Sequence, residues 1–164
     1  MSTPTDARTL LRHIVATLAY RAAKTLRDAP PGFGDFTNGS TIRTPCQILA
    51  HMGDLIAWGL RMIEGDKAWR AEGTADWERE ARRFFDCLAA LDEAIAERDP
   101  DSYRADKLIH GPLSDALTHV GQLAMLRGAA GAPLRPESYA RAEIEVGRVG
   151  LEQSAPRYEF EGDA

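Results

Sequence analysis

The stretch TPCQILAHMGDLIAWGLRMIE, residues 44–64, carries a complete helix signal. Thr44 is a good N-cap residue, and Pro45 suits the first helical position, where a backbone N–H has no intrahelical partner. Apolar residues then recur at helical spacing on one broad face, and Gly65 follows the last turn. The apolar positions are Ile48, Met52, Leu55, Trp58, Gly59 and Met62. The stretch predicts an amphipathic helix over residues 45–64.

Three more helices are predicted around this one. Each shows apolar residues at three-and-four spacing, and each is followed by proline or glycine. The expected bounds are about 5–27, 75–98 with Thr74 as the cap, and 113–130. The inward stripe of the first is expected to be Leu10, Leu11, Ile14, Val15, Leu18 and Ala22. Four such helices with few strand signals predict an all-α four-helix bundle, one domain spanning residues 1–164.

Two segments outside the helices are expected to pack against them. The loop after the first helix is long for a helix connection, and its Phe33 and Phe36 are expected to fold back onto the bundle. The tail over 131–164 is expected to be irregular but ordered, because its apolar residues would otherwise expose sticky surface. The tail residues expected to pack are Tyr139, Ile144, Val146 and Phe160.

Composition narrows the classes of partner. Acidic residues outnumber basic ones by 25 to 20, and the lysines and arginines form no cluster. Nucleic acids and anionic membranes select for concentrated positive charge, so neither is expected as a partner. No run approaches the ~18–20 apolar residues of a membrane span, and no secretory signal is visible. Cys46 and Cys87 form no metal-binding or disulfide pattern, so we expect inert buried thiols and a cytoplasmic protein.

The histidines differ in their positions. His51 shares the inward face of its helix with Ile48 and Leu55, where a histidine often only fills the core. Asp54, one turn on, could accept a hydrogen bond from its imidazole or orient it for another ligand. By contrast, His13 lies off the apolar stripe and is expected in solvent. His110 sits in a turn that enters the last helix, where loop hydrogen bonding is the expected role.

The last helix adds a second polar position inside the bundle. Asp115 and His119 are four residues apart, so they share one helix face, and Gln122 continues the same strip. An Asp–His pair at this spacing can hold one metal ion, or it can be an ordinary solvated contact. Most of the surrounding helix is apolar, which places the pair inside a bundle. A buried carboxylate there needs a partner or a metal.

Two stretches of the chain resemble the DinB-like family of helical bundles. TPCQILAHM, residues 44–52, is similar to the start of that family's second helix, where a histidine is the first metal ligand. GPLSDALTHVGQL, residues 111–123, is similar to its fourth helix, whose His-x-Gly-Gln stretch carries the last ligand. Many members have a histidine where this chain has Asp115. The resemblance therefore implies a divalent-metal site of His51, Asp115 and His119. We expect Gln122 or Asp54 to support these ligands without binding the metal itself.

The ligand set favours particular metals. Two histidines and one carboxylate suit zinc first, and they also suit nickel, iron(II) or manganese. Three protein ligands leave coordination positions open for a small molecule. The resemblance implies a small-molecule thiol as that ligand, because DinB-like proteins include thiol-dependent transferases and isomerases.

The sequence leaves two other classes of function open. A metal-dependent hydrolase would need a general base, for which Asp54 is the only nominee. A non-enzymatic bundle with a structural metal or none would be favoured by a fourth protein ligand such as His110. Nucleophile motifs such as Gly-x-Ser-x-Gly and His-Glu-x-x-His do not occur. Trp58, Trp69 and Trp77 offer more aromatic surface than one bundle needs, and with the resemblance they predict a homodimer.

Overall fold

The computed structural model describes residues 6–39 and 43–161. Within these ranges the chain is helical and contains no strand; Glu137 and Glu159 form an isolated antiparallel bridge. The all-α class is confirmed. The helices and turns are α1 (Ala7–Leu26), η1 (Phe33–Asp35), α2 (Pro45–Glu64), α3 (Trp77–Glu97), η2 (Pro100–Ser102), α4 (Ala105–Leu108), η3 (Ile109–Leu113), α5 (Ser114–Ala129) and η4 (Tyr139–Arg141).

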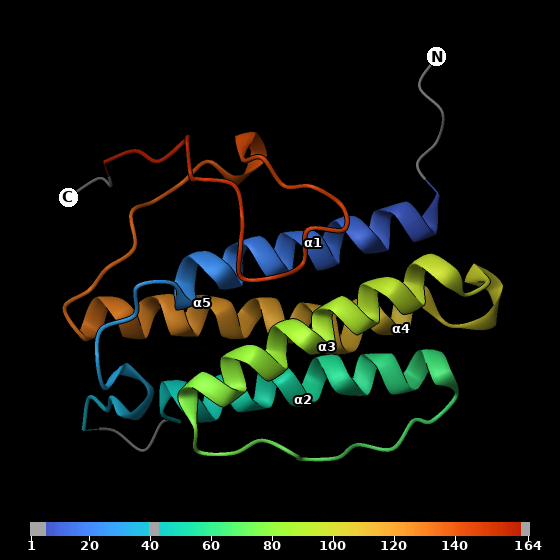
Figure 1. Cartoon of the computed structure of the whole chain (residues 1–164), viewed down its shortest axis with the longest axis horizontal. Helices are drawn as coiled ribbons and strands as arrows, with labels where there is room; N and C mark the ends of the chain where they lie inside the picture. The colour runs from blue at the N-terminus through green and yellow to red at the C-terminus, as the bar shows by residue number, and fades with distance from the viewer. Residues whose placement is uncertain (1–5, 40–42, 162–164) are drawn as a thin grey trace.

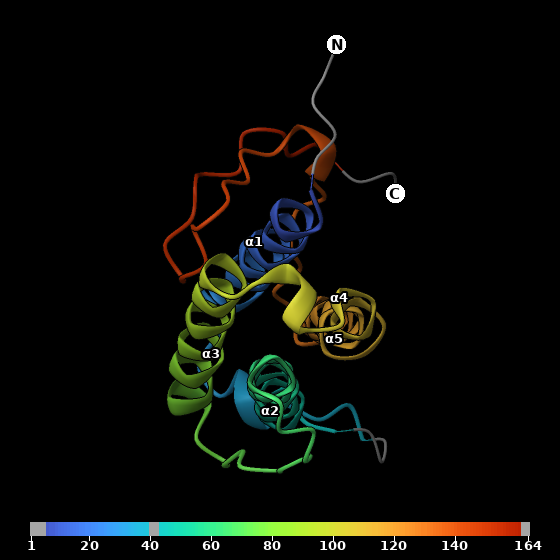
Figure 2. The ribbon, with the colours of Figure 1, turned by 90° about the vertical axis from the view of Figure 1, so that its right-hand side faces the viewer.

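The four long helices α1, α2, α3 and α5 lie side by side along the molecule (Figure 1). Viewed along the helices, they surround a common centre (Figure 2). Buried side chains from all four helices meet there in one hydrophobic core. Burial of this shared apolar surface is the main force that holds amphipathic helices together.

The order of the helices is not a simple up-and-down meander. In Figure 1, α2 and α3 run in the same direction, and the segment 65–76 returns along α2 to connect them. Hydrogen bonds confirm this return path: Trp58 Nε1 donates to the Lys67 carbonyl, and Arg61 Nε donates to the Ala68 carbonyl. We call residues 65–76 the crossover loop. The sequence showed it only as a break between two helices.

The helix α2 has the predicted bounds, because its capping residues act as expected. The Thr44 hydroxyl accepts from the Gln47 N–H, and the Gln47 side chain accepts from the Thr44 N–H, which forms a capping box. Gly65 ends the helix with φ of 90°, a conformation that glycine adopts without strain.

The start of α1 is one part of the prediction that needs correction. Asp6 caps the helix by accepting from the Thr9 N–H, and the predicted start at Thr5 lies outside the described residues. Leu10 was assigned to the inward stripe, yet 52% of it is exposed. Leu11, which belongs to the same predicted stripe, is buried as expected, so the apolar face of α1 is centred on the row that starts at Leu11.

The helix α3 begins two residues later than predicted. Asp76 caps it by accepting from the Arg79 N–H. Thr74, the predicted cap, instead donates from both its backbone N–H and its hydroxyl to Glu80. Glu80 is fully buried, and a buried carboxylate requires such donors. Because Thr74 donates to this buried carboxylate, Asp76 caps the helix in its place.

The last helix begins earlier than predicted. The chain is helical from Ala105, because the short helix α4 continues through the π-helix η3 into α5. The sequence predicted a start at about residue 113, since Gly111-Pro112 is typical of the turn before a helix. The wider π-turn instead accommodates Pro112, which has no N–H to donate. A side chain at Gly59 of α2 would lie 3.2 Å from Pro112 Cγ, so glycine allows α2 to approach this turn closely.

The loop after α1 packs as predicted. Phe33 is buried and lies edge-on to the Trp77 ring, with 5.5 Å between the ring centroids. Phe36 packs against the core and is partly buried. Trp58 and Trp69 also contact each other within the chain. Each tryptophan therefore has an aromatic partner of its own chain, and the homodimer stays a prediction.

The C-terminal tail packs on α1, but polar contacts hold it. The buried Glu137 carboxylate accepts from the Tyr20 hydroxyl at 2.6 Å and from Lys24 Nζ at 2.8 Å. Lys24 also pairs with Glu159 at 2.8 Å. The prediction that Phe160 packs on the bundle is wrong, because 51% of it is exposed. Within residues 131–161, the buried apolar residue is Val149.

Replacing Glu137 with alanine should release this tail. Tyr20 and Lys24 would lose their shared buried partner, so unfolding in urea should show a loss of about 2–4 kcal/mol. Trypsin should then cut faster after Arg141 and Arg148. The matched control is Glu143→Ala, because Glu143 pairs with Arg157 at the exposed surface and should show no measurable loss. Equal stability of the two variants would contradict the proposed anchor.

No helix among residues 6–39 and 43–161 is long and apolar enough to cross a membrane.

Candidate metal centre

Three side chains from two helices converge at one place in the bundle. His51 comes from α2, and Asp115 and His119 come from α5. One potential ligand atom from each lies within 4.8 Å of the other two. These are the three residues that the sequence singled out, and His51 lies far from Asp115 and His119 along the chain. Packing of α2 against α5 brings them together.

Their distances are close to those of a metal site. His119 Nε2 lies 3.4 Å from one oxygen of Asp115, and His51 Nε2 lies 3.8 Å from the other. Ligands at zinc distances of roughly 2.0–2.2 Å around a tetrahedral ion lie about 3.3–3.6 Å apart. A shift of a few tenths of an ångström would bring His51 and Asp115 into this range. The imidazole rings stand nearly perpendicular, with 5.0 Å between their centroids.

A hydrogen bond to Gln122 orients His119. The Gln122 Oε1 atom lies 2.7 Å from His119 Nδ1, and an amide oxygen can only accept. Nδ1 therefore carries the hydrogen in the neutral ring, and Nε2 presents a lone pair toward Asp115. A lone pair and a carboxylate oxygen repel each other unless a proton or a cation lies between them. The sequence nominated Gln122 or Asp54 as the residue that supports the ligands, and the structure places Gln122 in hydrogen-bond contact with His119.

The environment of His51 favours its neutral form. Burial, the nearby positive charge of Arg43 and the neighbouring His119 together lower the pKa of His51 below its usual value. Trp69 of the crossover loop lies against the imidazole, with 5.6 Å between ring centroids. A metal binds only the neutral imidazole, so this environment prepares His51 as a ligand.

The centre has a covered side and an open side. The His119 side chain is 11% exposed and that of His51 is 24% exposed, whereas that of Asp115 is 47% exposed. The expectation that the Asp115 carboxylate is buried is therefore wrong, because this turn of α5 lies at the surface. A shallow depression of about 340 Å³ also opens beside His51, lined in part by Arg43, Gln47 and Gly73. Small molecules could therefore reach an ion held by the three side chains.

The prediction that Asp54 serves His51 is wrong. Asp54 is buried, and one of its oxygens accepts from Arg83 Nη1 and from the Glu72 N–H, each at 3.0 Å. It therefore balances the charge of Arg83 and holds the crossover loop. No residue near Asp54 in the sequence indicated this partner, because Arg83 lies on another helix.

The other candidate residues lie outside the centre. His13 is exposed on α1, as predicted, and His110 is exposed in η3 beside a separate cavity. Cys46 is buried and Cys87 is partly buried, and burial raises the pKa of both thiols. Both thiols are therefore held in the protonated form, in line with the expected inert role.

Trp69 is the neighbour of the centre that sequence reasoning missed. It lies in the crossover loop, outside any periodic pattern, and it contacts both His51 and Trp58. Only the path of that loop along α2 brings it to the site. A lone tryptophan between two helices carries no local signal of such a role.

Comparisons with protein-family models, with characterised proteins and with solved structures found no match to this chain. The geometry of the centre therefore carries the functional argument.

Replacing Gln122 with alanine should weaken metal binding without removing a ligand. The His119 ring would lose the bond that fixes its tautomer, and such losses cost about 10–100-fold in metal affinity. A zinc titration with a chromogenic competitor would measure the change. Thr118→Ala, on the same helix but outside the centre, should bind zinc like the wild type; an equal loss in both variants would refute the role of Gln122.

Metal binding should also depend on pH. Both imidazoles must be neutral to bind, so protons compete with the metal and affinity should fall below about pH 6. The lowered pKa of His51 keeps that ligand available to lower pH than a free histidine. Zinc titrations from pH 5 to 8 should therefore show a monotonic rise in affinity. Affinity that is constant over this range would exclude histidine ligands.

Proposed function

We propose that this protein binds one divalent metal ion through His51, Asp115 and His119. The observation that carries the proposal is the convergence of two imidazole nitrogens and a carboxylate within 4.8 Å. The bond from His119 Nδ1 to Gln122 supports it, because it directs the free lone pair of His119 toward Asp115. Without a cation or a proton, these acceptor atoms would repel one another.

Zinc is the ion that this ligand set favours. Imidazole and carboxylate ligands at tetrahedral spacing suit zinc, and nickel, iron(II) and manganese accept the same donors. The carboxylate of Asp115 reduces the net charge of the site by one unit relative to three imidazoles. That change favours a harder ion than a three-histidine site does.

The open side supports a reactive centre over a structural one. Structural zinc sites are usually closed by four protein ligands, whereas catalytic sites hold three and leave a position free. Across residues 6–39 and 43–161, no fourth histidine, cysteine or carboxylate joins the group. His110, the nominated fourth ligand, lies elsewhere. A metal-dependent enzyme is therefore preferred to a non-enzymatic bundle.

A thiol-dependent transfer or isomerisation is the reaction class that we propose. The similarity of residues 44–52 and 111–123 to DinB-like proteins supports it, and so does the exposure of the site on the side of Asp115. A divalent ion at the site would lower the pKa of a bound small-molecule thiol and favour the thiolate. The hydrolase alternative loses support, because Asp54, its nominated base, is engaged by Arg83.

Replacement of His119 with alanine tests the metal site directly. Only two protein ligands would remain, so zinc affinity should fall by about 100-fold or more, and Asp115→Asn should cause a smaller loss. His13→Ala should bind zinc like the wild type, because His13 is exposed on α1. Equal affinity of the wild type and His119→Ala would show that the proposed site is wrong. Circular dichroism of each variant checks that the fold is retained.

A thiol-binding test then separates the functional classes. Cobalt-substituted protein should develop a sulfur-to-cobalt charge-transfer band in the near ultraviolet when 2-mercaptoethanol is added. The band reports direct binding of a thiolate, so it requires no knowledge of the natural substrate. His119→Ala should show no band at the same cobalt concentration. Cobalt binding without a thiol band would reject thiol chemistry and leave the metal site intact.

A further inference from the structure

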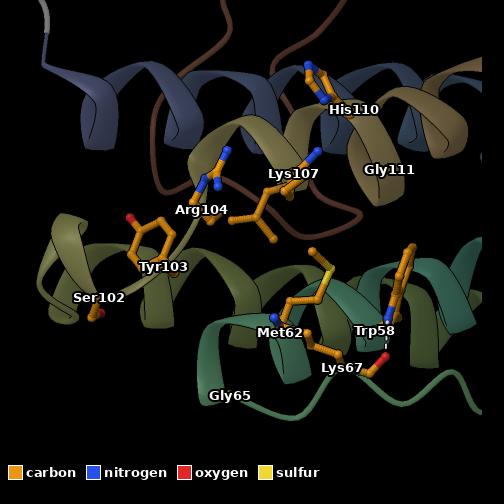
Figure 3. A pocket seen from close by; sticks show the side chains of 11 residues that line it. Trp58, Met62, Gly65, Lys67, Ser102, Tyr103, Arg104, Lys107, His110 and Gly111 are labelled. Atoms are coloured by element: carbon orange, nitrogen blue, oxygen red, sulfur yellow. Dashed lines mark hydrogen bonds between the residues drawn. The ribbon is translucent and has the colours of Figure 1, made fainter.

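A second cavity lies away from the three metal ligands. It has a volume of about 640 Å³ and is formed by the end of α2, the start of the crossover loop and the segment from η2 to η3. Figure 3 shows Trp58, Met62 and Lys67 on one side and Arg104, Lys107 and His110 on the other. Pockets for small molecules commonly measure about 300–1,000 Å³. The cavity is therefore large enough for a small organic ligand.

One part of the wall is apolar and partly aromatic. Trp58, Met62, Tyr103 and Leu108 supply it. The Trp58 indole N–H already donates to the Lys67 carbonyl at 3.1 Å, so the ring has no unsatisfied donor to direct at a ligand. Gly111 allows close packing on this ring, because a Cβ there would lie 3.3 Å from it. The wall is suited to a flat or aliphatic body.

The charged residues of the cavity are all basic. Lys67, Arg104 and Lys107 line it, and no aspartate or glutamate does, although the whole chain has a net charge of −5. Arg104 is engaged by Asp106 through two hydrogen bonds, at 2.9 and 2.7 Å. Neither Lys67 nor Lys107 forms an ion pair with any residue that the structure describes. Two lysines without an ion pair among the described residues therefore line one partly apolar pocket from opposite sides (Figure 3).

We propose that this cavity binds a small organic anion, with its apolar body against Trp58 and Met62 and its anionic group between Lys67 and Lys107. A few placed charges beside an apolar surface are typical of sites that orient such ligands. Ammonium groups attract carboxylates and phosphates. A simple inorganic anion has no apolar surface to bury against the wall, so it should bind more weakly than an organic anion.

Two tryptophans in contact connect the cavity to the metal centre. Trp58 lies edge-on to Trp69, with 5.8 Å between ring centroids, and Trp69 lies against His51. A ligand in the cavity would thus contact Trp58, the member of the pair that does not touch His51. The anion site itself does not depend on a metal, because its lining contains none of His51, Asp115 and His119.

Binding of 2-naphthoate to protein in EDTA tests this proposal. Isothermal titration calorimetry should detect binding of 2-naphthoate, while the uncharged 2-naphthalenemethanol should bind at least fivefold more weakly. Lys107→Gln should weaken binding of naphthoate about five- to tenfold and leave binding of the alcohol unchanged. Arg82→Gln is the matched control, since it removes one exposed positive charge of α3 outside the cavity. It should bind naphthoate like the wild type.

Other outcomes would overturn the proposal. Equal affinity for naphthoate and the alcohol would show that charge plays no part. Equal loss in Lys107→Gln and Arg82→Gln would show general electrostatic attraction without a site, and absence of binding at millimolar naphthoate would remove the site altogether. His119→Ala should bind naphthoate unchanged in EDTA, so failure of the metal site and failure of the anion site are separately detected.

Discussion

The buried ion pairs that Arg83 makes with Asp54 and Glu80 join α2 to α3, and much of the structure depends on them. Arg83 donates to Asp54 at 3.0 Å, to Glu80 at 2.7 Å and to the Ala50 carbonyl at 2.7 Å. Removing one member of such a group leaves an uncompensated charge in a medium of low dielectric constant, which is strongly destabilising. The guanidinium lies close to the backbone of α2 because position 53 is glycine; a Cβ there would lie 2.7 Å from it.

This charged group also fixes the crossover loop. Asp54 accepts from the Glu72 N–H, and Glu80 accepts from Thr74, so both ends of the group hold the loop against α2. Gly73 allows the close contact, because a Cβ there would lie 2.6 Å from the Ala50 side chain. The fixed loop places Trp69 against His51. One buried network thus joins α2 to α3 and holds the loop that carries Trp69 to the metal centre.

The π-helix before α5 shapes the other side of the centre. A π-turn takes up an extra residue, so it rotates the side chains that follow it relative to those before it. Gly59 lets α2 approach this turn, and Asp115 and His119 follow it within two turns of α5. The three proposed metal ligands lie on the Trp69 side of the Trp58–Trp69 pair. The cavity, which has an apolar wall and basic residues, lies on the Trp58 side.

The sequence by itself determined the all-α class, the bounds of α2 and the identity of the three converging residues. Those features are local: a capping box and a terminal glycine define a helix, and an Asp–His pair four residues apart must share one helix face. Only the tertiary structure decided that Asp54 pairs with Arg83, that Thr74 serves Glu80, and that Pro112 lies within a continuous helix. It also decided that Trp69 covers His51 and that Lys67 and Lys107 face one cavity. Each of these features depends on which segment lies beside a given residue in space. Buried charged groups must be paired, and their partners can be distant along the chain.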